Sequence, residues 1–160
     1  MKYRTVKLFD LVYGEGVSKE DVLAILADFS CPLNEDVEDF VRHKAYDFER
    51  VGMSRTYLVF AQDCDGLHLC GIYSLSPGVI DIDPSISKKK RKQVFGTTYP
   101  VGKVLKTYLI GQLSKNFKDG NDHYISGELL LELAFERIRE NNKVVPTTKV
   151  SSLDYKNGAK

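Results

Sequence analysis

The chain has 160 residues, enough for one domain with a real core, and its 42% hydrophobic and 28% charged residues are typical of a soluble globular protein. The formal net charge of +1 by itself favours no polyanionic partner. No apolar run approaches the roughly 20 residues that span a bilayer, and the N-terminus lacks the apolar segment of a signal peptide. Three cysteines without paired spacing argue against disulfides and predict a cytoplasmic protein, and the cysteines and histidines share no metal-ligand spacing.

The N-terminal third of the sequence predicts one strand followed by two helices. Ser18 and Asn34 are typical N-cap residues, each with acidic residues close behind it. The apolar positions after Asn34 follow helical spacing, with Lys44 the one polar residue among them, and Gly52 stops the helix. The expected elements are a strand over residues 3–12, a helix that begins at 18 and is ended by Cys31-Pro32, and a helix from 34 to about 50.

The rest of the sequence predicts three further strands and a long helix. These are strands over 56–61, 67–75 and 103–117, a short helix that opens at 83–85 and carries 88–92, and a helix from 126 to about 142. Gly71 inside a strand indicates a bulge or a close backbone approach. The order β-α-α-β-β-β-α predicts a single α+β domain over residues 1–160, with helices on both faces of a mixed, largely antiparallel sheet.

Residues 103–140 form the most informative stretch, a strand joined to a helix by a polar loop. Such a helix directs its free N–H groups and its positive dipole end at whatever lies beyond the strand, which suits a phosphate group. A strand with an unpaired edge can bind an extended, amide-bearing chain as an added strand would. An ordinary strand and helix with a polar connection is the alternative interpretation.

Three segments of the sequence resemble the GNAT N-acetyltransferases. They are the helix-to-hairpin stretch 36–60, LCGIYSLS at 69–76, and YLIGQLSKNF at 108–117 followed by ISGELLLELAFERI at 125–138. The resemblance covers roughly residues 3–142 and implies transfer of an acetyl group from acetyl-CoA to a primary amine. It is closest in style to the toxin-type members, which acetylate the amine of aminoacyl-tRNA and are held by a DNA-binding antitoxin. The acceptor is therefore a small molecule, a peptide or an aminoacyl-tRNA, and an antitoxin-like protein or a second copy of the chain is an expected partner.

The same resemblance implies where acetyl-CoA lies. Its pantetheine arm follows Gln112, Leu113, Ser114 and Lys115, where a main-chain N–H polarises the acetyl carbonyl. Its diphosphate rests on the loop that contains Asn121, His123, Tyr124, Ile125, Ser126 and Gly127. Gly127 matches the last glycine of the family's loop, but Ile125 stands where the middle glycine is expected. Asp122 repels phosphate unless it is turned away.

The C-terminal tail departs furthest from the family pattern. A complete member continues with further strands and a helix, whereas only about 18 residues follow the long helix here. Tyr155, within DYKNGA, stands at the family's tyrosine and is implied as the general acid that reprotonates the departing thiolate. A solvent-exposed tail tyrosine is the alternative for Tyr155. A catalytically inactive GNAT-like interaction module is the alternative for the whole chain.

Two further features leave their interpretation open. The general base is not singled out by the sequence, and the candidates are Glu49, Asp81, Asp83, His43, His68 and His123. The dense charge run KKKRK at 88–92 is most simply a solvated helix or loop. Contact with the phosphate backbone of RNA is its functional alternative, and the lack of interleaved aromatic residues argues against base stacking.

Overall fold

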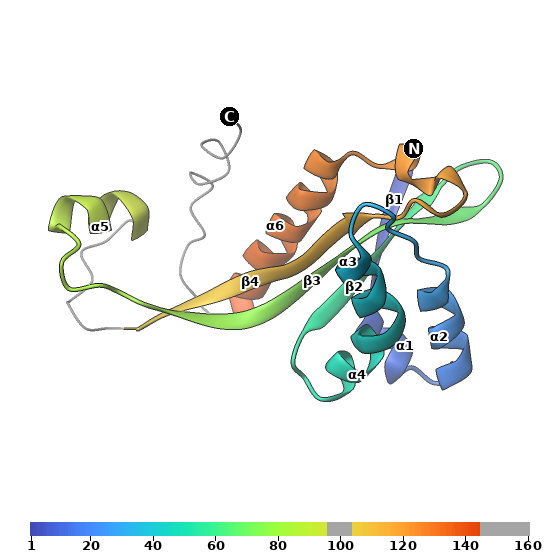
Figure 1. The fold of residues 1–160 in the computed structure, drawn as a ribbon, viewed down its shortest axis with the longest axis horizontal. Coiled ribbons are helices and arrows are strands. Elements are labelled where there is room, and N and C mark those ends of the chain that lie inside the picture. Colours follow the sequence, from blue (N-terminus) through green and yellow to red (C-terminus); the bar gives the residue numbers. More distant parts are fainter. Residues whose placement is uncertain (96–103, 145–160) are drawn as a thin grey trace. The chain divides into compact units, whose positions relative to one another are not determined.

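The computed structural model describes residues 1–95 and 104–144, and Figure 1 shows its elements. The strands are β1 (Lys2–Lys7), β2 (Arg55–Gln62), β3 (Leu67–Asp81) and β4 (Val104–Lys115). The helices are α1 (Leu8–Val12), α2 (Lys19–Ala27), α3 (Glu35–Asp39), the π-helix η1 (Phe40–Lys44), α4 (Ala45–Arg50), α5 (Lys88–Phe95), the 3-10 helix η2 (Lys118–Tyr124) and α6 (Gly127–Val144). Within these ranges no helix is both long and apolar enough to cross a bilayer. The predicted α+β fold class is confirmed.

The chain divides into two compact units. The first contains residues 1–76 and 110–137, and the second contains residues 77–109 and the chain from 138 onward. Strands β3 and β4 and helix α6 each contribute residues to both units. In the second unit the distal parts of β3 and β4 approach closely, since a Cβ added at Gly78 would lie 3.0 Å from Thr107 Oγ1.

The sheet has the strand order β1-β2-β3-β4. β1 pairs antiparallel with β2, from Lys2 opposite Gln62 to Lys7 opposite Tyr57, and β2 pairs antiparallel with β3. The predicted hairpin of β2 and β3 is therefore confirmed. β4 is the outer strand beside β3, so in the described part of the chain one of its edges has no sheet partner.

A bulge in β3 accounts for Gly71. The register between β2 and β3 shifts at Val59 and Phe60, which leaves Cys70 as the extra residue. A Cβ at Gly71 would lie 3.1 Å from the carbonyl oxygen of Ser114 and 3.2 Å from the Leu130 side chain. The predicted bulge and close approach are both confirmed. Only glycine lets β4 and α6 approach β3 this closely.

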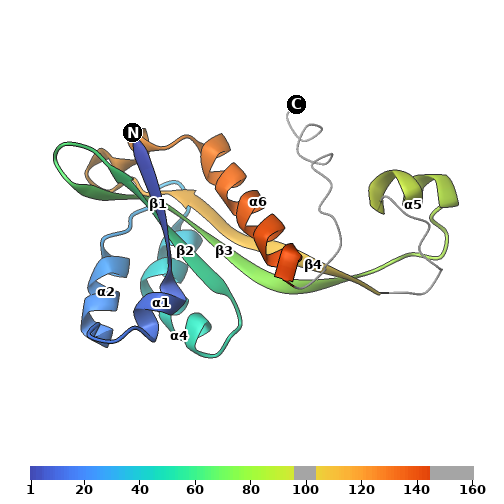
Figure 2. The same cartoon turned by 180° about the vertical axis from the view of Figure 1, so that it is seen from behind.

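Helices cover both faces of the sheet in the first unit, as the sequence predicts (Figures 1 and 2). One face packs against α1 to α4 around a core that includes Leu8, Leu26, Phe29, Leu58 and Ile72. Alternate residues of a strand point to opposite faces, so Tyr57 and Gly71 face the other way. There they meet α6, where Leu130 lies against Gly71 and the Arg137 guanidinium lies 5.2 Å from the centre of the Tyr57 ring.

The first predicted strand is wrong in its second half, because residues 8–12 form α1. Leu8 is fully buried, and Leu11 and Val12 pack against the same core at helical spacing. Ser18 caps α2 through a capping box with Asp21, as its position predicts. α2 itself ends at Ala27, before the predicted end of that helix at Cys31-Pro32.

The second predicted helix is present but contains a π-helical turn. Asn34 caps its start by accepting hydrogen bonds from the N–H groups of Asp36 and Val37, and Gly52 follows its end with φ of 73°. The π-helix η1 adds one residue to the helical period, so of the two neighbours that the sequence assigns to the apolar stripe, Lys44 and Ala45, only Ala45 is buried. Lys44 instead lies at the surface and pairs with Asp39.

Candidate functional site

Strand β4 provides the feature that the sequence assigns to the pantetheine arm. Gln112, Leu113, Ser114 and Lys115 lie at its C-terminal end, each with a half-buried side chain. An outer strand turns alternate N–H and C=O groups away from its sheet. This segment therefore has main-chain groups of the kind that hydrogen-bond an extended amide chain.

The loop between α2 and α3 borders this end of β4. The Phe117 N–H donates to the carbonyl oxygen of Ser30 at 2.8 Å, and the Ser114 hydroxyl donates to the Cys31 sulfur at 3.2 Å. Main-chain pairing with this loop is therefore at Phe117, after the segment 112–115. The fold brings together two elements here that lie more than 80 residues apart in the sequence.

Asn116 fixes that loop, and sequence reasoning missed it. Its side chain is fully buried and donates to the carbonyl oxygens of Asp28 and Leu69 at 3.0 and 2.9 Å. Its oxygen accepts from the N–H groups of Ser30 at 2.8 Å and Lys118 at 3.1 Å. An asparagine after a strand is a common turn residue, so no signal in the sequence distinguishes this one.

Asp122 is turned toward a cation in the structure. The Lys115 ammonium donates to the Asp122 carbonyl oxygen at 2.8 Å and lies 3.6 Å from its carboxylate. The helix η2 that carries Asp122 kinks at Asp119 and Gly120, which have φ of 53° and 74°. The ion pair offsets the negative charge of Asp122, which would otherwise repel phosphate.

Tyr124 ties η2 to the first strands of the sheet. Its ring stacks on His68, with ring centres 4.7 Å apart, and its carbonyl oxygen accepts from the Tyr3 hydroxyl at 2.7 Å. The Tyr124 hydroxyl hydrogen-bonds to Asp63, which lowers the pKa of that carboxyl to about 2 and raises the pKa of the tyrosine. The His123 ring also packs on the Tyr124 ring, with centres 4.1 Å apart. We call these contacts the Tyr124 clip.

Helix α6 begins in the form expected for an anion site. The Leu129 N–H donates to the Ser126 hydroxyl at 3.1 Å, which confirms Ser126 as the N-cap. A Cβ at Gly127 would meet no atom within 4 Å among the described residues, so there is room for a side chain at this position. In residues 1–95 and 104–144 no acceptor takes the N–H groups of Gly127 and Glu128. Ile125 is buried, so only its main chain is available to a ligand.

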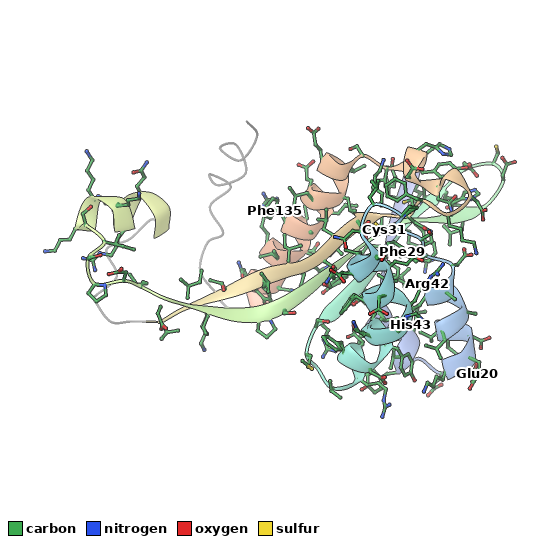
Figure 3. All side chains as sticks on the ribbon, in the orientation of Figure 1. Glu20, Phe29, Cys31, Arg42, His43 and Phe135 are labelled. Carbon is green, nitrogen blue, oxygen red and sulfur yellow. The ribbon has the colours of Figure 1, made fainter. Side chains whose placement is uncertain are left out.

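A pocket of about 520 Å³ adjoins the loop between α2 and α3. Figure 3 shows three of its residues, Cys31, Arg42 and His43, on the side of α2 and α3. Glu38 accepts from the Cys31 N–H at 2.6 Å and pairs with Arg42 at 2.8 Å, and the bond from Cys31 lowers the pKa of Glu38. The complete lining is Ser30, Cys31, Pro32, Glu35, Glu38, Asp39, Arg42 and His43.

Solved structures of toxins have the same arrangement of elements. A tyrosine-to-phenylalanine variant of KacT matches with a TM-score of 0.62 at 16% identity, over 92% of this chain and 75% of KacT. AtaT complexed with acetyl-methionyl-tRNAfMet matches with a TM-score of 0.60 at 17% identity, over 91% and 74%. AtaTR bound with AcCoA matches with a TM-score of 0.58 at 17% identity, over 91% and 73%. The chain has the GNAT fold.

The likeness to GNAT toxins is structural. No protein-family profile matches the sequence, and no curated protein matches it either. At 15–20% identity the matched structures establish the fold, and the roles of individual residues stay predictions.

The carboxylates proposed as general bases lie in different parts of this GNAT fold. Glu49 is buried and holds the Arg55 guanidinium and the Thr56 N–H, so it is structural. Asp81 ends β3 and Asp83 accepts from the Ser85 N–H at 2.7 Å, and both are exposed in the second unit. Tyr155, the implied general acid, lies outside the described residues.

The turn between β2 and β3 holds a cluster of possible cation ligands. Asp63, Cys64 and Asp65 could meet one cation. One oxygen of Asp63, however, already accepts from two N–H groups of the turn and lies 3.1 Å from the His68 ring nitrogen. We therefore assign this cluster to the structure of the turn.

The pocket is the part of the candidate site that sequence reasoning missed most completely. The sequence offers His43 as a possible base, but it does not single out Glu35, Glu38, Asp39 or Arg42. Their acidic pattern indicates only a solvated helix face. Their convergence depends on how the α2–α3 loop is held by Asn116, which has no local signature.

Proposed function

We propose that the protein is a GNAT-type N-acetyltransferase that uses acetyl-CoA and acts on the amine of an aminoacyl group carried by RNA. The observation that carries the proposal is the presence of three features in one unit: the outer edge of β4, the N–H groups at the start of α6 that are uncapped within the described residues, and the pocket at Ser30 and Cys31. AtaT, which has the same fold, is described in complex with acetyl-methionyl-tRNAfMet, and AtaTR with AcCoA. These complexes support the donor and the acceptor class.

In this proposal the chain contributes positioning rather than covalent chemistry. The segment Gln112 to Lys115 hydrogen-bonds the pantetheine arm, and a main-chain N–H near Leu113 polarises the acetyl carbonyl. The N–H groups of Gly127 and Glu128 and the side chain of Asn121 receive the diphosphate. The amine nitrogen bonds to the acetyl carbon, the carbon–sulfur bond breaks, and the thiolate leaves with the proton that the amine gives up.

A charge placed at Gly127 tests the cofactor site. Gly127→Glu adds a carboxylate at the first turn of α6, where the helix dipole favours it and the structure has room for it. The fold should therefore be retained, while repulsion of the diphosphate weakens acetyl-CoA binding by about tenfold or more. Isothermal titration calorimetry with acetyl-CoA measures the loss.

Two controls accompany this variant. Gly127→Ala fills the same open space without charge and should bind acetyl-CoA like the wild type. Acetyl-pantetheine lacks the diphosphate and should bind the Gly127→Glu variant and the wild type equally. Equal binding of acetyl-CoA by the wild type and both variants would show that the diphosphate does not bind at the start of α6.

A catalytically inactive interaction module is the second candidate. KacTA, which has the same fold, is described in complex with DNA, so a chain of this fold can be part of an assembly that contains DNA. We infer an antitoxin-like partner for this chain on that ground. Acetyl-CoA at about 100 times its dissociation constant should stabilise an active protein by about 2.7 kcal/mol. A thermal scan without any shift at millimolar acetyl-CoA would favour the module.

A further inference from the structure

We propose that helix α5 is a binding surface for the phosphate backbone of RNA, formed by Lys88, Lys89, Lys90 and Lys92. The four side chains are exposed, whereas Arg91 between them is buried. The inference rests on the proposed function only for the choice of RNA among polyanions. The surface itself is defined by charge and exposure in the second unit.

Positive charge is concentrated in the part of the sequence that contains this helix. Residues 77–109 hold seven lysines and arginines against the two acids Asp81 and Asp83, a net charge of +5. Because the whole chain carries +1, the remaining residues sum to −4. A basic segment in an otherwise acidic chain attracts a polyanion locally, which a uniformly basic protein does not do.

The four lysines also have no acidic partner in the described part of the chain. Other lysines do find one: Lys44 pairs with Asp39, Lys115 with Asp122 and Lys118 with Asp28. No ion pair forms at Lys88, Lys89, Lys90 or Lys92 within residues 1–95 and 104–144. With respect to the described residues, their ammonium groups are available to neutralise an outside anion.

The position of these lysines in α5 is unfavourable without such an anion. Ser87 caps the helix, with the Lys90 N–H donating to its hydroxyl at 3.2 Å, so three lysines lie in the first turn. Cations there oppose the helix dipole, and like charges at spacings of three and four residues repel each other. Phosphates bound along α5 would offset both the unfavourable interaction with the helix dipole and the repulsion between the lysines, as expected of a helix that binds an anion.

RNA fits this surface better than a membrane or a protein does. Lysines without exposed aromatic neighbours among residues 88–92 suit backbone contacts, which position a nucleic acid without reading its bases. An amphipathic membrane helix needs a row of large apolar residues opposite its cations, whereas α5 has only Val94 and Phe95, at its C-terminal end, and the buried residue among 88–92 is Arg91. The proposed acceptor, an aminoacyl group on RNA, brings the phosphates with it.

The test compares two variants that each remove four positive charges. One replaces Lys88, Lys89, Lys90 and Lys92 by glutamine, a good helix former, so that α5 and the fold are kept. The matched control replaces Lys2, Arg4, Lys7 and Lys19 by glutamine, since these are exposed as well but lie in the first unit. Thermal unfolding verifies that both variants are folded. Fluorescence anisotropy then measures affinity for a labelled RNA hairpin over a series of salt concentrations, without acetyl-CoA.

We expect the α5 variant to lose at least about tenfold in affinity near 0.1 M salt. We also expect its log–log salt dependence to flatten by about 3, because each phosphate contact contributes about 0.7 to 0.9 to that slope. The control should keep the wild-type slope. Replacing the four lysines of α5 by arginine should restore binding.

Several results would overturn the proposal. They are the absence of RNA binding by the wild type, an unchanged slope in the α5 variant, an equal loss in both glutamine variants, and tighter binding of a DNA duplex. Preference for phosphatidylserine vesicles that RNA does not displace would assign α5 to a membrane surface instead. The RNA assay contains no acetyl-CoA, so its result does not depend on the cofactor site. A failure of the proposed activity would appear in the acetyl-CoA titration of Gly127→Glu, whereas a failure of this inference would appear in the RNA titration of the α5 variant.

Discussion

At the residue scale, Asn116 is the side chain on which the candidate site depends most. One amide group satisfies two N–H donors and two carbonyl acceptors from the loop, β3 and η2, in a fully buried position. Buried polar groups that lose their partner keep the full cost of their desolvation. The α2–α3 loop is therefore held at β4 by hydrogen bonding rather than by apolar contact alone.

Asn116→Ala should lower the free energy of unfolding by about 3 kcal/mol or more, because four main-chain groups lose their partner together. Urea denaturation measures the change. Asn121→Ala is the matched control, since the Asn121 side chain has no hydrogen bond in the described ranges, and it should stay within about 0.5 kcal/mol of the wild type. Equal stability of the two variants would contradict the assigned role of Asn116.

Residues with a local signal are predictable at this scale. Ser18, Asn34 and Ser126 are caps whose partners lie two or three residues away, so the sequence alone predicts them. The partners of Asn116 include Asp28 and Leu69, which are 88 and 47 residues away. Long-range partners of a polar residue depend on the whole fold and leave no local pattern.

At the element scale, the Tyr124 clip holds the helix η2 in front of α6. Asp63 belongs to the turn between β2 and β3, and its low pKa of about 2 comes first from the Tyr124 hydroxyl and then from N–H groups of its own turn and His68. A carboxyl whose pKa falls on folding stabilises the folded state while it is ionised. That stabilisation is complete above the ordinary value of 3.8 and is lost as the pH falls toward about 2.

Asp63→Asn should therefore be less stable than the wild type at neutral pH. The difference in melting temperature between the two proteins should shrink between about pH 4 and pH 2 and then vanish. Thermal unfolding followed by circular dichroism at a series of pH values measures it. Asp65→Asn in the same turn, whose side chain makes no hydrogen bond in the described part of the chain, should show no such convergence.

The elements themselves are largely predictable from the sequence, and the errors have physical causes. The alternation of Val6 and Leu8 favours a strand that continues through residues 8–12, but the core takes Leu8, Leu11 and Val12 at helical spacing. The pattern after Asn34 predicts a helix of constant period, which a π-helical turn violates. The bulge near Gly71 is predictable because a strand gains nothing from glycine unless its backbone bends or is closely approached.

At the scale of the whole molecule, the three cysteines differ in how accessible their thiols are in the folded protein. Cys64 is exposed, whereas Cys31 and Cys70 are buried, and burial raises the pKa of Cys70 to about 11. The thiolate is the reactive form, so a buried thiol with a raised pKa is inert in the folded state.

Iodoacetamide at neutral pH should accordingly modify Cys64 rapidly and the other two only after unfolding. Mass spectrometry of the labelled protein over time measures the three rates, and Cys64→Ser should remove the fast phase. Rapid labelling of Cys31 in the native protein would show that the α2–α3 loop leaves β4, which would contradict its contact with Ser114.

The fold as a whole is predictable because its signals are periodic and sequential, and the matched toxins confirm the GNAT fold. The β4, η2 and α6 part of the candidate site is predictable for the same reason, since its residues are contiguous. The pocket is not, because Ser30 reaches β4 through Asn116, 86 residues later.

The π-helical turn at Phe40–Lys44 has a consequence for how this chain can change. Before the turn Val37 is buried, and after it Ala45 and Glu49 are buried, so the two halves of the segment are in different helical phase. Removing a single residue from the turn would restore an unbroken helix and rotate everything after it around the axis. Asp39, Arg42 and His43 sit on or beside the turn, so the shape of the pocket is set by the length of this segment as much as by its side chains.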